Sequence, residues 1–455
     1  MKPPYRVPSM REIEALPHNG FTVVSTFSGC GGSCLGYRMA GFRVAWANEF
    51  IPSAQATYRA NHPETILDTR DIRTIAPQEI LNAIQLKAGE LDLFDGSPPC
   101  ASFSTAGKRE KHWGKEKRYS DTVQRTDDLF FEYVRLLDGL KPKVFIAENV
   151  SGLVKGVAKG YFLEILARFK ASGYRVECRV LDAQWLGVPQ SRKRAIFMGV
   201  RQDLERNPVF PKPFPYRYSI RDAMPWIVGG KYGPSWKAST HPSPTVSAQQ
   251  TYNPATSHQG LELVEAIIHD TRGSFPSAGD VTDRPCPTIT VESSGQFRAR
   301  VIGGNGSVFD DKGAEFNLDE PSPTIMTKSD QLLVENVVGE NPSENLSIER
   351  FAIGREWDAL KPGQGSKRYF NLVKPDSNEP CPTICASHGH PGIAGVTHPT
   401  EKRKLTIAEL KRICAFPDDF DLKGTYAQQW ERLGRSVPPV MMLQIASAVR
   451  DHVLT

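Results

Sequence analysis

Short apolar runs that suit β-strands alternate with helical patterns over the first two hundred residues. Each run ends in turn residues, whereas the segments between them carry apolar positions at helical spacing. The predicted strands are 21–27, 43–49, 92–95, 144–148, 175–181 and 194–200, and the predicted helices are a stretch ending at Met39, 127–140 and 161–172. Strands that alternate with helices predict an α/β fold with a doubly wound, mostly parallel sheet that is covered on both faces.

The pattern changes near residue 201, where proline and glycine become frequent and helical spacing fades. A similar tetrapeptide recurs at Ser243–Val246, Cys286–Ile289, Ser322–Ile325 and Cys381–Ile384. It indicates either strands that begin at proline or a duplicated strand-loop unit, and its uneven spacing argues against a solenoid. Helical patterns return at 406–416 and 436–453. We therefore predict a first domain over 1–200, a smaller, irregular, β-rich domain inserted over 201–375, and a return segment over 376–455 whose C-terminal helix packs on the first domain.

Composition narrows the class of protein. The chain has 455 residues, 39% of them apolar and 24% charged, so more than one domain is expected, because a single core stops growing at about 250–300 residues. The formal net charge of +5 permits a polyanionic partner without requiring one. No apolar run approaches the roughly 20 residues of a membrane span, and no signal peptide is recognisable. We expect a cytoplasmic monomer without a membrane partner, and its eight cysteines as reduced thiols.

A glycine-rich turn between the first predicted strand and helix is the first candidate binding element. Residues 27–32 read Phe-Ser-Gly-Cys-Gly-Gly, which allows a ligand to approach the backbone but does not match the dinucleotide fingerprint. Glu49 ends the next strand, where a carboxylate can accept hydrogen bonds from a ribose diol. The pair suggests an adenosyl group at the carboxyl edge of the sheet, although Glu49 also fits a solvated strand end.

Cys100 is the strongest candidate for chemistry. It follows Pro98 and Pro99 directly after a buried-type strand, so a rigid loop presents it at the functional edge. A cysteine is more often a small buried apolar residue, but one displayed in this way suggests a nucleophile. Glu148 ends the next strong strand and lies on the same edge. A carboxylic acid beside a thiol suggests attack on an electron-poor ring whose nitrogen must be protonated.

Together these motifs resemble the DNA cytosine-C5 methyltransferase family over most of the chain. Their order is 27–32, Glu49, Asp71-Ile72, Ser97–Cys100 with Phe103-Ser104, Leu129–Phe131, Glu148–Val150, Gln190–Arg194, Pro382–Ile384, Leu405-Thr406, Phe416–Asp419 and Gly434–Pro439. Each motif alone is a modest signal. Their number and collinear order make coincidence very improbable.

The resemblance implies a role for each motif. Cys100 would be the nucleophile that adds to C6 of cytosine, and Glu148 would bind N3 and the exocyclic amine. Arg192 would contact O2, and Arg194 would orient the nucleophile loop or nearby groups. The cofactor would be S-adenosylmethionine, with Phe27 against the adenine. The residues expected to bind it are Phe27, Ser28, Gly29, Gly31, Gly32, Glu49, Asp71, Ile72, Pro98, Leu129, Arg435, Ser436 and Val437. No motif identifies the base that removes the C5 proton.

The implied partner is double-stranded DNA, from which the target cytosine must be flipped. The segment after Cys100 combines positive charge with an aromatic residue, which suits contacts to backbone phosphates, although it also fits a solvated loop. The residues expected to contact DNA are Ser102, Ser104, Lys108, Arg109, Lys111, Trp113, Lys115 and Arg118. Residues 201–375 would supply contacts to base edges in the major groove as a target-recognition domain.

One cluster resembles metal ligands. Cys381, Cys385, His388 and His390 are crowded together, but no second Cys-x-x-Cys motif accompanies them and Cys381 belongs to the Pro-Thr-Ile segment. We therefore expect no metal site.

The last motif departs from the family, which usually has asparagine where this chain has Arg435. The arginine introduces a fixed cation with carboxylate-binding geometry near the methionine end of the cofactor. Three interpretations compete. Arg435 binds the cofactor's own carboxylate or a neighbouring acid, it impairs catalysis, or it recognises carboxy-S-adenosylmethionine so that a carboxymethyl group is transferred.

Two further alternatives concern the substrate. An RNA cytosine methyltransferase is disfavoured by the long recognition region and by the lack of that branch's Cys-Phe-Thr segment. A DNA-binding protein without activity is disfavoured by the intact Cys100, Glu148 and Arg192. We expect a DNA methyltransferase of a bacterial or phage-infected cell, whose recognition sequence and biological setting the sequence does not reveal.

Overall fold

The computed structural model describes residues 2–99, 117–119, 122–124, 128–154, 159–227, 298–300, 333–335 and 346–455. Contacts divide the chain into two units, one made of Met1–Pro225 and Ile348–Thr455 and the other of Trp226–Ser347. Residues 201–225 and 348–375, which we expected in the smaller domain, thus belong to the larger unit. In the smaller unit, β10 (Arg298–Arg300) pairs in antiparallel fashion with β11 (Leu333–Glu335). The recognition role of the inserted region stays a prediction.

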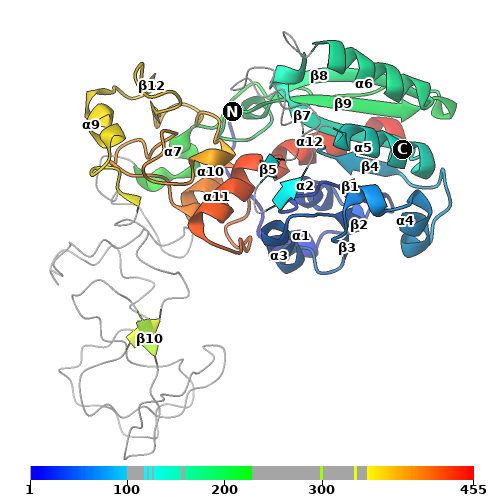
Figure 1. Cartoon of the computed structure of the whole chain (residues 1–455), viewed down its shortest axis with the longest axis horizontal. Coiled ribbons are helices and arrows are strands. Elements are labelled where there is room, and N and C mark those ends of the chain that lie inside the picture. Colours follow the sequence, from blue (N-terminus) through cyan, green and yellow to red (C-terminus); the bar gives the residue numbers. More distant parts are fainter. Residues whose placement is uncertain are drawn as a thin grey trace, which may run out of the picture. The chain divides into compact units, whose positions relative to one another are not determined.

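A seven-stranded sheet forms the centre of the larger unit, in the order β3-β2-β1-β4-β7-β9-β8 (Figure 1). Its strands are β1 (Thr22–Thr26), β2 (Arg43–Asn48), β3 (Ile66–Asp68), β4 (Leu93–Gly96), β7 (Val144–Val150), β8 (Tyr174–Asp182) and β9 (Lys193–Arg201). The first five of these pair in parallel, whereas β9 is antiparallel to both β7 and β8. The predicted mostly parallel α/β fold is confirmed.

Helices cover both faces of this sheet because neighbouring strand residues point to opposite sides. Val23 belongs to one core cluster together with α2 (Gly32–Met39) and α12 (Pro439–Val449), whereas Val24 belongs to the other together with α4 (Pro77–Ile84), α5 (Leu129–Leu140) and α6 (Lys159–Ala171). Helices α2 and α12 lie close together, since a Cβ added at Gly36 would be 2.5 Å from the Pro439 carbonyl oxygen. The end of the chain therefore packs directly against the first helix after β1.

Short elements complete the larger unit. Its other helices are α1 (Met10–Glu14), α3 (Pro52–Asn61), α7 (Ile220–Ala223), α9 (Ala352–Ala359), α10 (Ile407–Ile413) and α11 (Tyr426–Arg435), with 3-10 turns η1 (Ile72–Thr74), η2 (Ser151–Val154), η4 (Ala183–Trp185), η5 (Gln202–Leu204), η6 (Pro225–Ile227) and η8 (Ala386–His388), and η9 (Arg450–Leu454) as a π-helical turn. Two small hairpins pair β5 (Lys117–Tyr119) with β6 (Thr122–Gln124) and β12 (Gln364–Gly365) with β13 (Val373–Lys374).

A separate small core lies at 348–372, in the part of the larger unit that follows the inserted unit. Ile348, Ile353, Trp357, Leu360 and Leu372 bury one another there. In the part of the chain that the structure describes, no helix is long and apolar enough to cross a bilayer.

Candidate functional site

Four parallel strands end together at one edge of the sheet. The register pairs Thr26 of β1 with Asn48 of β2 and with Gly96 of β4, and Gly96 in turn with Ala147 of β7. The glycine-rich turn, Glu49 and Pro98 follow β1, β2 and β4, whereas Glu148 lies within β7, one residue beyond Ala147. In open α/β folds, ligands bind at the carboxyl edge of the parallel strands. The described residues that we expect to bind the cofactor and the cytosine lie along this edge.

The glycine-rich turn after β1 is built around left-handed backbone. Gly29 has φ 59°, and Gly31, the N-cap residue of α2, has φ 90°. A Cβ at Gly31 would lie 2.2 Å from His62 Nε2, and one at Gly32 would lie 2.5 Å from the Val437 carbonyl oxygen. Phe27 also has a positive φ, 54°, which is uncommon for a residue with a side chain. The turn therefore needs glycine both for its backbone conformation and for close approach of the C-terminal segment.

Glu49 is fixed beside this turn. Its carboxylate accepts hydrogen bonds from the backbone N–H groups of Gly29 and Ile51, each at 2.6 Å. The residue is 6% exposed, and its burial raises the pKa of the carboxyl while these two bonds lower it. The sequence-predicted pair of turn and acid is thus in direct contact.

A second group of predicted cofactor residues meets through Arg73. Asp71 caps η1 and accepts a hydrogen bond from the backbone N–H of Arg73 at 3.0 Å. The Arg73 guanidinium pairs with Asp71 at 3.0 Å and with Asp128 at 2.7 Å, and Asp128 directly precedes Leu129. Ile72 and Leu129 are both 3% exposed. Arg73 itself was missed, because no motif marks an arginine that joins two acids from distant segments.

Glu148 is the central residue among those expected to bind the target cytosine. It lies on β7, is 7% exposed, and its Oε1 pairs with Arg194 Nε at 2.7 Å. Arg194 comes from β9, where it pairs in register with Val150. The Asn149 amide donates to the Pro98 carbonyl at 3.1 Å, so the end of β7 is tied to the loop that leads to Cys100. Cys100 itself lies outside the described residues.

Arg192 has different surroundings. It is 1% exposed and donates to the carbonyl oxygens of Ile384 at 3.3 Å and Arg435 at 3.2 Å. Burial lowers the pKa of its guanidinium to about 9, Arg194 lowers it further, and Glu148 opposes this shift. The side chain paired with Glu148 is therefore that of Arg194, whereas Arg192 joins the Pro-Thr-Ile segment to the last motif.

The last motif, Gly434–Pro439, packs against the glycine-rich turn that is expected to bind the cofactor. Ser436 Oγ lies 2.9 Å from Cys30 Sγ in the glycine-rich turn, and Val437 contacts Gly32. Arg435 is 35% exposed and its Nε pairs with Glu431 Oε1 at 2.7 Å, while Arg432 pairs with the other oxygen of Glu431 at 3.0 Å. Of the interpretations of Arg435, the one that invokes a neighbouring acid has this contact in its favour.

The predicted DNA-contacting residues lie mostly outside the described part of the chain. Those are Ser102, Ser104, Lys108, Arg109, Lys111, Trp113 and Lys115. Arg118 falls within β5, but its side chain is not described. Among the residues that are described, no three His, Cys, Asp or Glu side chains gather as metal ligands.

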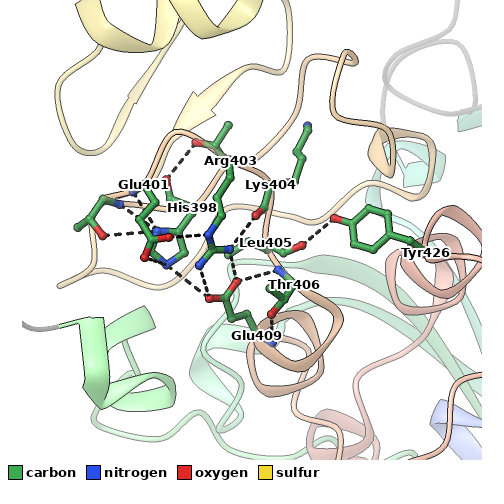
Figure 2. Close-up of polar contacts among 10 residues, drawn as sticks. His398, Glu401, Arg403, Lys404, Leu405, Thr406, Glu409 and Tyr426 are labelled. Carbon is green, nitrogen blue, oxygen red and sulfur yellow. Dashed lines mark hydrogen bonds and ion pairs between the residues drawn. The ribbon is translucent and has the colours of Figure 1, made fainter. Parts of the chain in front are cut away.

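A buried charge cluster at the start of α10 was not predicted (Figure 2). The Arg403 guanidinium binds both oxygens of Glu409 at 2.8 Å, and His398 Nε2 lies 3.5 Å from the same carboxylate. Burial opposes ionisation of Glu409, but Arg403 prevails and lowers the pKa of its carboxyl to about 2. Thr406 and Glu409 form a capping box, which is the one sequence signal that pointed to this acid.

Comparisons with known proteins agree on one family. A family model described as C-5 cytosine-specific DNA methylase matches residues 21–451. The Type II methyltransferase M.NgoPII of Neisseria gonorrhoeae is 37% identical over 45% of this chain and 54% of that protein. The Type II methyltransferase M1.HphI of Haemophilus parahaemolyticus is 26% identical over 94% of this chain and 86% of that protein. The crystal structure of a prophage-encoded E. coli protein has a TM-score of 0.56 at 19% identity, covering 96% of this chain and 100% of that one, and shares the fold.

Proposed function

Because the chain belongs to the C-5 cytosine-specific DNA methylase family, we propose that it transfers a methyl group from S-adenosylmethionine to C5 of a cytosine in double-stranded DNA. The observation that carries the proposal is the buried Glu148 carboxylate, held by Arg194 at 2.7 Å and tied through Asn149 to the loop before Cys100. An acid in that position can bind N3 of a pyrimidine whose C6 faces the thiol.

The cofactor side fits an adenosyl methionine. The glycine-rich turn leaves open space at Gly29, where an added Cβ would meet nothing within 4 Å, and Glu49 supplies a buried acceptor beside it. Phe27, Ile72 and Leu129 would provide apolar surface for the adenine. Asp71, which precedes Ile72, and Pro98 would line the same pocket. Ser28, Ser436 and Val437 would hold the methionine end. When bound, this group supplies an electrophilic methyl.

The chemistry of the chain's own residues follows from their types. The Cys100 thiolate adds to C6 and forms a C–S bond, while Glu148 in its protonated form donates its proton to N3. The C5–C6 pair then moves between C4 and C5, and the C4–N3 pair moves onto the protonated N3. C5 becomes nucleophilic and gains the methyl group. Once the methyl group is in place and N3 has returned its proton to Glu148, loss of the C5 proton to a base restores the C5–C6 double bond and expels the Cys100 thiolate.

The two arginines of the Gln190–Arg194 motif would act in different ways. Arg194 orients Glu148 directly, through the contact at 2.7 Å. Arg192 is a positioning residue, because its donors hold the Ile384 and Arg435 carbonyl groups rather than the acid. We thus propose that Arg194, instead of Arg192, lies beside the bound cytosine.

Access to the base requires flipping, to which the segment after Cys100 would contribute. Its Lys108, Arg109, Lys111, Lys115 and Arg118 would contact backbone phosphates around Trp113. The inserted region would read base edges in the major groove. The relatives are named Type II methyltransferases, which suits a role in marking bacterial or phage DNA in the cytoplasm.

Mass spectrometry of nucleosides tests the proposal. Duplex DNA incubated with the protein and S-adenosylmethionine should yield 5-methylcytosine, and Cys100→Ser should yield none. Modification of single-stranded RNA but not of duplex DNA would contradict it.

A second candidate is carboxymethyl transfer from carboxy-S-adenosylmethionine. The observation in its favour is that two arginines, Arg432 and Arg435, both pair with Glu431 next to Ser436 and the glycine-rich turn. An arginine guanidinium can bind a carboxylate through two parallel hydrogen bonds, which is the geometry that an extra carboxylate on the cofactor would require. The same nucleoside analysis with each cofactor separates the candidates: 5-carboxymethylcytosine that is lost in Arg435→Asn supports it, and 5-methylcytosine alone excludes it.

A further inference from the structure

A buried polar chain connects the glycine-rich turn to the strand that leads to Cys100. Ser28 of the turn donates through its Oγ to Ser25 Oγ at 3.1 Å, and Ser25 Oγ donates to Asp95 Oδ2 at 2.9 Å. On the other side, the Tyr37 hydroxyl of α2 donates to Asp95 Oδ1 at 3.0 Å. Asp95 is 1% exposed, and Ser25 and Tyr37 are fully buried. None of these groups has a role in the chemistry proposed above, except Ser28 as a cofactor contact.

Asp95 occupies the centre of the sheet. It lies on β4, where it pairs with Ser25 of β1 and Ile146 of β7, and Gly96 to Pro99 follow it toward Cys100. The titratable groups that face it are Cys34 and Tyr37 on α2, Tyr133 on α5 and Glu148 on β7. A buried acid among hydroxyl groups can exist in either protonation state, and the hydroxyl hydrogens can rotate to suit each state.

Protonation of Asp95 would reverse the direction of the hydrogen bonds that link Asp95, Ser25 and Ser28. When Asp95 is ionised, both serine hydroxyls donate inward, as in this structure. When Asp95 is protonated it can donate to Ser25, which then donates to Ser28, and the Ser28 hydrogen is released toward the turn. The turn thus gains a donor that oxygen atoms of a bound ligand can use.

We propose that Asp95 is a positioning residue whose protonation, relayed through Ser25 and Ser28, sets the affinity of the glycine-rich turn for its adenosyl cofactor. The proposal rests on the cofactor role assigned to residues 27–32. Burial raises the pKa of Asp95 to about 7, its bonds from Ser25 and Tyr37 lower it, and Glu148 raises it, so the change falls within the physiological range. One hydrogen bond gained corresponds to about three- to tenfold tighter binding below the transition than above it.

Cofactor binding measured from pH 6 to 8 (about one unit either side of the transition) tests this without depending on turnover. The wild type should bind S-adenosylmethionine and its demethylated product more tightly at low pH, with a midpoint near 7. Asp95→Asn should bind both equally at every pH. Ser25→Ala should also lose the dependence, because it cuts the relay but keeps the acid. Tyr37→Phe removes a bond that stabilises the ionised carboxylate, so it should move the midpoint upward.

Infrared spectra of the protein without ligand supply an independent readout. The carbonyl band of a protonated carboxylic acid should titrate near neutral pH in wild type and in Ser25→Ala, and be absent in Asp95→Asn. An unchanged binding profile in Asp95→Asn overturns the inference. The inference is also overturned if affinity depends on pH for the cationic S-adenosylmethionine but not for its neutral product. A charge effect, and not the relay, would then be responsible. Absence of cofactor binding at every pH would instead count against the proposed function.

Discussion

At the scale of single residues, the site depends on how Glu148 is held. Its contact with Arg194 orients a carboxyl group that must exchange a proton with the ring, and proton transfer of this kind contributes about 10²–10⁴-fold to rates. Glu148→Gln keeps the shape of the side chain but not its acidity. We expect methyl transfer to fall by about 10²-fold or more, with cofactor and DNA affinity nearly unchanged. Glu164→Gln, in an exposed helical ion pair, is the control and should retain full activity.

The two arginines should respond differently to the same replacement. Arg194→Lys loses the Nε contact with Glu148, so kcat should fall while the Kd for cofactor stays near that of wild type. Arg192→Lys loses donors to the Ile384 and Arg435 carbonyl groups, so cofactor binding should weaken first. Single-turnover rates and cofactor titrations of both variants separate the effects. Equal losses of kcat in the two variants, with unchanged cofactor affinity, would contradict the division of roles.

At the scale of elements, the turn after β1 and the segment after α11 must meet closely. A methyl group at Gly32 would lie 2.5 Å from the Val437 carbonyl oxygen. Gly32→Ala should therefore weaken cofactor binding and lower the free energy of unfolding by about 1–3 kcal/mol, as overpacking does. Gly160→Ala is the matched control: it lies in α6 with nothing within 4 Å, and should stabilise the protein by roughly 0.5–1 kcal/mol. Urea denaturation and cofactor titration measure both, and equal stability of the two variants would refute the close contact.

The start of α10 depends on the buried pair of Arg403 and Glu409. Removal of Glu409 leaves the buried Arg403 paired with the exposed Glu401 at 2.7 Å, so the cost should reach at most the roughly 3–5 kcal/mol of a broken buried pair. Glu409→Gln should show a loss of this size in urea, while Arg403→Met combined with Glu409→Leu should recover much of it, because neither charge remains. A single variant as stable as wild type would show that the pair does not hold this region together.

At the scale of the whole molecule, buried imidazoles should make the free energy of unfolding depend on pH in mildly acidic solution. Burial lowers the pKa of His398 to about 4 from its ordinary 6.5. Between these values the unfolded chain binds a proton at this position and the folded chain does not, so the free energy of unfolding should decrease as the pH falls from 6.5 to 4. His398→Asn should reduce this slope in urea denaturation at a series of pH values. A slope in His398→Asn identical to that of the wild type would contradict the assignment.

The sequence predicted the parallel half of the fold and the edge at which the site lies, because strand periodicity and strand-end motifs are local signals. Glu49 and Glu148 were recognisable for the same reason. It did not predict that β9 runs antiparallel to β7, nor that this geometry brings Arg194 rather than Arg192 to Glu148. Arg73, Asp95 and Arg403 were missed as well, since each depends on partners from distant segments that spacing along the chain does not reveal.

In the proposed reaction, the Cys100 thiol attacks a cytosine in duplex DNA while Glu148 activates the ring. The most direct measurement is the intact mass of the protein after incubation with S-adenosylmethionine and a duplex that carries 5-fluorocytosine, because fluorine cannot leave as a proton does. The account predicts a covalent protein–DNA adduct that contains the transferred methyl group and maps to Cys100. An adduct on another residue, or product formation by Cys100→Ser at the wild-type rate, would contradict it.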